Sequence, residues 1–188
     1  KLEKAAEKGR IGRPVRVMLV GAPNTGKSTI INALAGRKAA VTGDKPGVTK
    51  DFKWIMTGGR LELMDMAGVL WPRIANARSG ICLTALGSVK EEITDVVKVS
   101  YETLKIMIDI YPNLIKERYG VNIEIEQNED EGYYQDPYYD LFLEMAKKRG
   151  CIMSGGRIDE ERFARLFLND LREGRTGRIT LEMPEDFK

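Results

Sequence analysis

The chain has 188 residues, of which 43% are hydrophobic, enough for one large domain or two small ones with packed cores. The formal net charge of +2 excludes a strongly basic nucleic-acid-binding protein, so any RNA site must be a local patch. Histidine is absent and the two cysteines lie in unrelated contexts, which excludes the commonest general base and a cysteine metal site. No apolar stretch approaches the length of a membrane span and no signal peptide is visible, so we expect a cytoplasmic protein without a membrane partner.

Residues 1–14 are polar and mostly basic, and Gly9, Gly12 and Pro14 interrupt any helix there. We interpret them as a solvated basic linker. The alternative is a linker that lies near RNA.

A phosphate-binding loop follows the first predicted strand. Residues 15–20 form the apolar, β-branched run of a buried strand, and residues 29–35 have a helical pattern that ends at Gly36. Between them, residues 21–28 read G-A-P-N-T-G-K-S, which fits G-x-x-x-x-G-K-[ST]. The backbone of such a loop surrounds an anion at a helix N-terminus. We expect Lys27 to reach the β- and γ-phosphates and the Ser28 hydroxyl to bind Mg²⁺.

A glycine- and proline-containing loop is predicted at residues 41–49. Thr49 is the candidate switch residue, offering its hydroxyl to Mg²⁺ and its backbone N–H to the γ-phosphate, because Gly47 lets the backbone approach closely. A plain surface loop would have a similar sequence.

A hairpin is predicted next, with strand-like runs at residues 52–57 and 60–65 on either side of a Gly58-Gly59 turn. The second run ends in Asp65-Met66-Ala67-Gly68. An aspartate at the end of a strand suits a magnesium site, and a glycine three residues later suits an N–H that senses the γ-phosphate.

The remaining chain changes to a helical period. The pattern predicts helices at residues 77–92, from an Asp95 cap to Pro112, at 112–119, at 137–149, and from an Asp159 cap to Gly174. Residues 124–131 are acidic and predict a loop, and residues 178–183 predict a short strand or an extended tail.

Basic residues cluster in this helical part: Lys147, Lys148, Arg149 and Arg157, then Arg172, Arg175 and Arg178. They predict either a phosphate-facing patch for RNA or an ordinary charged helix surface.

These segments together resemble the YlqF/RbgA family, bacterial circularly permuted GTPases that act in assembly of the large ribosomal subunit. The likeness rests on residues 21–28, 42–49, 63–72, 111–112, 116–120 and 148–156, and runs from about residue 10 to the end. The Gly-Val-Leu-Trp-Pro run and the Lys-Arg-Gly-Cys-Ile-Met-Ser-Gly-Gly run narrow it from P-loop NTPases in general to this family.

The resemblance implies an α/β P-loop NTPase fold, part of a circularly permuted GTPase domain at residues 15–75, followed by an all-α RNA- or ribosome-binding domain at residues 76–188. It implies binding of GTP and Mg²⁺. The residues implied to contact the nucleotide are Asn24, Thr25, Gly26, Lys27, Ser28, Thr29 and Gly68. The implied magnesium ligands are Ser28, Thr49 and Asp65. The implied catalytic residues are Lys27 and Thr49. Asn24 resembles an asparagine that coordinates K⁺ in related GTPases. The implied partners are the precursor of the large ribosomal subunit and its rRNA, with no DNA expected.

The sequence departs from the family pattern in ways that concern base recognition and hydrolysis. Ala67 replaces the proline of Asp-x-Pro-Gly, which should make that turn more flexible. No Asn-Lys-x-Asp guanine-reading motif occurs, and the family's N-terminal histidine has no counterpart. In the permuted family that motif precedes the phosphate loop, so the sequence reads as a fragment that lacks this half. Val69 stands where many small GTPases carry a water-positioning glutamine.

Three functions therefore remain open at this stage. The leading one is a GTP-binding and GTP-hydrolysing factor in late assembly of the large ribosomal subunit. The second is a fragment that acts only as an RNA- or ribosome-binding helical module. The third is a P-loop NTPase of other nucleotide selectivity.

Overall fold

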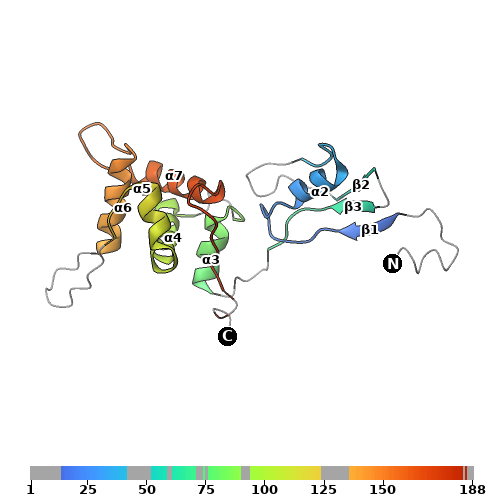
Figure 1. The fold of residues 1–188 in the computed structure, drawn as a ribbon, viewed down its shortest axis with the longest axis horizontal. Coiled ribbons are helices and arrows are strands. Elements are labelled where there is room, and N and C mark those ends of the chain that lie inside the picture. The colour runs from blue at the N-terminus through green and yellow to red at the C-terminus, as the bar shows by residue number, and fades with distance from the viewer. Residues whose placement is uncertain are drawn as a thin grey trace. The chain divides into compact units, whose positions relative to one another are not determined.

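The computed structural model describes residues 14–41, 52–58, 61–70, 74, 76–89, 94–123, 136–183 and 185. The chain divides into two compact units (Figure 1). The phosphate-loop unit lies within residues 1–73 and 87–90, and the helical unit lies within residues 74–86 and 91–188.

The phosphate-loop unit contains a three-stranded sheet in the order β1-β3-β2. Its elements are β1 (Val15–Met18), α2 (Lys27–Ala35), β2 (Lys53–Met56) and β3 (Leu61–Asp65). β1 runs parallel to β3, and β2 is antiparallel to β3 with Ile55 opposite Leu63. The predicted hairpin is thus confirmed, whereas the first strand ends at Met18 instead of residue 20.

One face of this sheet is covered and the other is exposed. Ile31 of α2 is fully buried, in a small core that also contains Ile55 and Leu63. The alternation of side chains places Met18 and Met56 on the opposite face, where they are 55% and 50% exposed. The described part of this unit therefore supplies a covering helix to one side of the sheet only.

The helical unit consists of α3 (Ala77–Ala85), α4 (Val96–Ile110), α5 (Pro112–Tyr119), α6 (Pro137–Lys148) and α7 (Glu160–Arg172) (Figure 1). α4 packs against α3, α5, α6 and α7, so it is the central helix of this unit. The core is rich in aromatic rings. The rings of Phe142 and Phe163 meet edge to face at 4.9 Å between centroids.

The helix starts follow the predicted caps. The Asp95 carboxylate accepts a hydrogen bond from the Lys98 N–H at 3.0 Å, and the Asp159 carboxylate accepts one from the Arg162 N–H at 3.0 Å. Pro112 occupies the first turn of α5. In the described part of the chain, no helix is long and apolar enough to span a membrane.

One helix of this unit is shorter than predicted. α3 ends at Ala85 instead of residue 92, because Gly87 adopts a left-handed conformation (φ 74°) and Arg172 of α7 donates hydrogen bonds to the carbonyls of Thr84 and Ala85. Residues 178–183 contain no strand, which removes the strand from the two predicted alternatives and leaves the tail. Apart from Pro14 and Val41, the predicted linker and the predicted loop that contains Thr49 lie outside the described residues, and so does the predicted acidic loop.

Candidate functional site

The phosphate loop connects β1 to α2 as the motif predicts. Gly26 caps α2 with a left-handed backbone (φ 81°) and no side-chain hydrogen bond, and Asn24 also has a positive φ of 59°. Because no side chain occupies the cap, the amides of the first helical turn face the loop, where an anion is favoured by their N–H groups and by the helix dipole.

Two side chains of the loop fold back onto one carbonyl group. The Thr25 hydroxyl donates to the Ala22 oxygen at 2.9 Å, and the Lys27 ammonium donates to the same oxygen at 2.6 Å. Burial lowers the pKa of Lys27, and the nearby Asp65 carboxylate raises it in part. The lysine charge is thus held over the loop at the position where phosphate oxygens would bind.

A hydroxyl and a carboxylate from two different elements meet beside the loop. The Ser28 hydroxyl, in the first turn of α2, lies 3.5 Å from Asp65 Oδ1 at the end of β3. Asp65 is only 4% exposed. Hard oxygen atoms of this kind fit Mg²⁺, which is usually held by one or two protein groups together with phosphate oxygens and water. Among the described residues, no three His, Cys, Asp or Glu side chains form a metal-binding group.

The segment after Asp65 packs directly on the phosphate loop. The Val69 N–H donates to the Gly21 carbonyl at 3.1 Å. A Cβ atom at Gly68 would lie 2.4 Å from both N and Cα of Pro23, which is closer than real Cβ contacts. Glycine is therefore required at position 68 because its backbone approaches the backbone of the phosphate loop too closely for a side chain. The backbone of Gly68 itself does not have a positive φ.

Ser88 is a further contact to the loop that the sequence reasoning missed. It is 3% exposed, and its hydroxyl donates to the Pro23 carbonyl at 2.7 Å. The sequence predicts one helix over residues 77–92, which places Ser88 inside a helix instead of in a loop. The glycine at position 87 was the only sequence signal for a helix end there.

Of the predicted nucleotide and magnesium residues, Thr49 lies outside the described residues. Among the others, the structure brings Ser28 together with Asp65, and it packs Gly68 on Ala22 and Pro23 of the phosphate loop. Asn32 of α2 fixes the chain that leads toward Thr49, because its side-chain oxygen accepts hydrogen bonds from the N–H groups of Ala39 and Ala40 at 2.9 and 2.7 Å.

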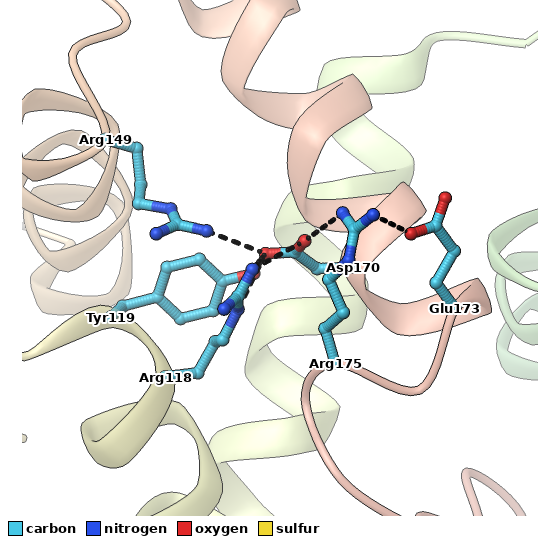
Figure 2. A network of polar contacts seen from close by, with 6 residues as sticks. All are labelled: Arg118, Tyr119, Arg149, Asp170, Glu173 and Arg175. Atoms are coloured by element: carbon cyan, nitrogen blue, oxygen red, sulfur yellow. Dashed lines mark hydrogen bonds and ion pairs between the residues drawn. The ribbon is translucent and has the colours of Figure 1, made fainter.

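In the helical unit, a buried carboxylate gathers several of the basic residues. Asp170 of α7 is 1% exposed and accepts hydrogen bonds from Arg118, Arg149 and Arg175, at 2.9 to 3.2 Å (Figure 2). The Tyr119 hydroxyl adds a fifth hydrogen bond at 3.2 Å. Burial by itself would raise the pKa of Asp170, but the guanidinium groups of Arg118 and Arg175 outweigh this and hold the pKa below its usual value.

Fewer cations are therefore available in the predicted basic patch than the sequence suggests. Arg149 and Arg175 bind Asp170, and Arg172 binds the end of α3. Lys148 pairs with Glu144 at 3.0 Å and also contacts the Gly120 carbonyl. Lys147, Arg157 and Arg178 are exposed and make no ion pair with another described residue. These three are the cations of the predicted patch that remain available to a partner.

Comparison with protein families gives a match to the model described as "50S ribosome-binding GTPase" over residues 16–130, which is more than half of the chain. The chain belongs to this family. Membership agrees with the P-loop GTPase fold expected from the sequence.

Two named relatives resemble the chain over nearly its whole length. The chain is 41% identical to "Ribosome biogenesis GTPase A" of Bacillus cereus over 187 residues, covering 100% of this chain and 60% of that protein. It is 32% identical to the protein of the same name from Thermotoga maritima, covering 93% of this chain and 58% of the relative. The chain thus spans less than two thirds of the length of these relatives.

Two solved structures of YlqF share the fold. The GDP-bound structure of "TM YlqF" is 27% identical with a TM-score of 0.60, and covers 98% of this chain and 67% of that one. GNP-bound YlqF from T. maritima is also 27% identical, with a TM-score of 0.57, covering 98% of this chain and 66% of that one. The homology to the YlqF/RbgA proteins predicted from the motifs is confirmed.

Proposed function

We propose that this chain belongs to a GTPase that binds GTP with Mg²⁺ and acts in late assembly of the large ribosomal subunit. The observation that carries the proposal is the junction of α2, β3 and the Gly68 segment. There Lys27 donates to a phosphate-loop carbonyl, and Ser28 in the first turn of α2 meets Asp65. The 50S ribosome-binding GTPase family and the names of the relatives support the same activity.

Each residue of the junction has a distinct role in this proposal. The backbone amides of residues 24–29 bind the phosphates, and Lys27 neutralises charge on the β- and γ-phosphates as it develops. Ser28 and Asp65 hold Mg²⁺, with Thr49 as a third ligand. Mg²⁺, when bound, supplies charge neutralisation between the β- and γ-phosphate oxygens. The Gly68 N–H senses the γ-phosphate.

In this proposal, Val69, the residue after Gly68, does not activate the attacking water. Val69 is 59% exposed and has no polar side-chain atom that could orient or deprotonate water. We propose that K⁺ coordinated by Asn24, another segment, or the ribosome supplies this help. Asn24 is suited to such a role because its left-handed backbone places it at the bend of the phosphate loop.

The second half of the chain, residues 76–188, is proposed to dock on the precursor of the large ribosomal subunit and its rRNA in the cytoplasm, with neither DNA nor a membrane as partner. Residues 15–75 provide the phosphate loop and switch segments, and residues 1–14 provide a basic linker. Support for the docking role comes from Lys147, Arg157 and Arg178, the exposed cations described above. The nucleotide state would order or release the segments around Thr49 and Gly68 and thereby change docking.

A second candidate is a chain that acts only as a ribosome- or RNA-binding module. It is favoured by the exposed cations Lys147, Arg157 and Arg178 of the helical unit, which could contact RNA without a bound nucleotide. A P-loop NTPase without guanine selectivity is the third.

Co-sedimentation with large ribosomal subunits separates the first two candidates. We expect the chain to sediment with the subunits more strongly with a non-hydrolysable GTP analogue than with GDP, and we expect Lys27→Ala to remove this difference. Equal sedimentation under all nucleotide conditions would favour the binding module. A response to the ATP analogue equal to the response to the GTP analogue would favour the third candidate.

A further inference from the structure

An open groove lies in the helical unit between α6 and the turn that precedes α7. Its volume is about 490 Å³, and it is lined by Leu143, Met153, Arg157, Ile158 and Glu160. The lining is apolar at its centre, with one cation and one carboxylate. None of these residues belongs to the Asp170 cluster or to the phosphate loop.

The turn that forms one wall is built rigidly. Ile152 and Ile158 form an isolated antiparallel bridge, and the Met153 N–H donates to the Arg157 carbonyl at 2.8 Å. Gly155 and Gly156 take positive φ values of 86° and 81°, which closes the turn without strain. Met153 is left 44% exposed. The apolar wall is therefore held in place before any ligand binds, which lowers the entropic cost of binding.

The opposite wall is one face of α6. Tyr139 and Lys147 lie four residues before and after Leu143, so the three share a helix face. Tyr139 is 38% exposed, and partial burial together with its hydrogen bond to Glu160 raises the pKa of the phenol. An aromatic ring, an apolar side chain and a cation thus follow one another along this face of α6, and of the three Leu143 lines the groove itself.

The cations beside the groove differ from those around Asp170. Lys147 and Arg157 are exposed and have no ion-pair partner among the described residues, whereas Arg149 is paired with Asp170. An unpaired cation at the edge of an apolar groove can bind a phosphate without first breaking an internal ion pair. Lys147 and Arg157 are therefore the phosphate-binding candidates.

We infer that this groove binds an unpaired nucleotide of single-stranded RNA, an inference that rests on the proposed role of the helical unit in RNA binding. The base lies against Leu143, Met153 and Ile158, and one flanking phosphate binds Arg157 of the lining. The other flanking phosphate binds Lys147, one turn beyond Leu143 on α6. The Glu160 carboxylate accepts hydrogen bonds from the N–H groups of the base. Sequence-specific recognition of RNA mostly uses unpaired bases of this kind.

The mixed charge of the lining favours a nucleotide over a peptide. Glu160 in the lining repels an acidic peptide, and a basic one is repelled by Arg157 in the lining and by Lys147, one turn beyond Leu143 on α6. A nucleotide carries both a negative phosphate and a base with N–H donors, so it complements both kinds of charge.

The test uses the full chain and a 12-nucleotide RNA with a central 2-aminopurine, as a single strand and as a duplex. Met153→Glu places a carboxylate in the groove. Leu34→Glu is the matched control, because Leu34 is 52% exposed and lies in α2, outside the helical unit. We expect Met153→Glu to weaken single-strand binding at least tenfold and duplex binding less than twofold, with Leu34→Glu within twofold of the original chain for both. Circular dichroism melts check that the variants fold.

The outcomes separate the groove from the wider proposal. If Met153→Glu and Leu34→Glu bind the single strand equally, the groove does not bind a base and the inference is wrong. If Met153→Glu lowers sedimentation with large subunits but leaves RNA binding unchanged, the occupant is a protein segment and the inference is again wrong. Failure of the original chain to sediment with large subunits would instead contradict the proposed docking function.

Discussion

Replacing Gly68 by alanine should break the contact between the phosphate loop and the segment after β3. The added Cβ would lie 2.4 Å from N and Cα of Pro23 and 2.9 Å from the carbonyl carbon of Ala22. Ordinary contacts of this type begin near 3.4 Å. All of these neighbours are backbone atoms, so no rotamer change can relieve the clash.

The expected cost follows from the two ways in which the chain can respond. If the loop and the Gly68 segment stay together, the strain corresponds to overpacking, at about 1–3 kcal/mol. If the segment moves away, the hydrogen bond from the Val69 N–H to the Gly21 carbonyl is lost, at about 0.5–1.5 kcal/mol together with the packing around it. Either way we expect the phosphate-loop unit to lose about 1–3 kcal/mol of stability.

Urea unfolding followed by tryptophan fluorescence measures this loss selectively, because both tryptophans of the chain, Trp54 and Trp71, fall in the phosphate-loop unit. Gly58→Ala is the matched control, since a Cβ at Gly58 would meet no atom within 4 Å. If the same loss of about 1–3 kcal/mol destabilises the nucleotide-bound chain relative to the free chain, we expect the GTP affinity of Gly68→Ala to fall about 5- to 150-fold. Equal stability and equal affinity of the two variants would refute the reasoning.

Three further changes test other parts of the account. Ser88→Ala removes the hydrogen bond to the Pro23 carbonyl and should destabilise the phosphate-loop unit by about 1 kcal/mol in the same fluorescence assay, and no change would exclude Ser88 as a support of the loop. Asp170→Asn leaves three guanidinium groups without their carboxylate and should cost the helical unit about 3–5 kcal/mol at pH 7, seen as a lower melting temperature by circular dichroism. Because the pKa of Asp170 is below its usual value in the folded chain, its stabilising effect is complete above the unfolded pKa of about 4 and is lost as the pH falls through the folded pKa. The difference in melting temperature between the original chain and Asp170→Asn should therefore narrow on acidification. A difference that does not depend on pH would contradict this. Arg172→Ala should lower the melting temperature of the helical unit by uncapping α3, while Arg178→Ala, at an exposed position, should not; equal effects would refute the cap.

Local signals in the sequence were sufficient to predict most elements. Asp95, Pro112 and Asp159 start helices for reasons that involve only the next few residues, and the phosphate loop is defined by its own glycines and lysine. The hairpin of β2 and β3 likewise follows from alternation around a Gly-Gly turn.

The parts that could not be predicted depend on contacts between distant residues. The end of α3 at Ala85 needs Arg172, which is 87 positions away in sequence. The Asp170 cluster joins Arg118 and Arg149 from other helices, and a list of basic residues cannot say which of them are neutralised inside the fold. The same applies to Ser88, whose role depends on where Pro23 lies.

Calorimetric titration of the chain with GTP and MgCl₂, in potassium and then in sodium buffer, is the most direct test of the central claim. The account predicts Mg²⁺-dependent binding at one site, lost in Lys27→Ala and strongly weakened in Asp65→Asn. The reason is that the proposed function assigns the phosphates to Lys27, which lies on the loop backbone, and the metal to Asp65, which lies beside Ser28. Binding that persists unchanged in both variants, or no binding by the original chain, would contradict the claim that this loop is a nucleotide site.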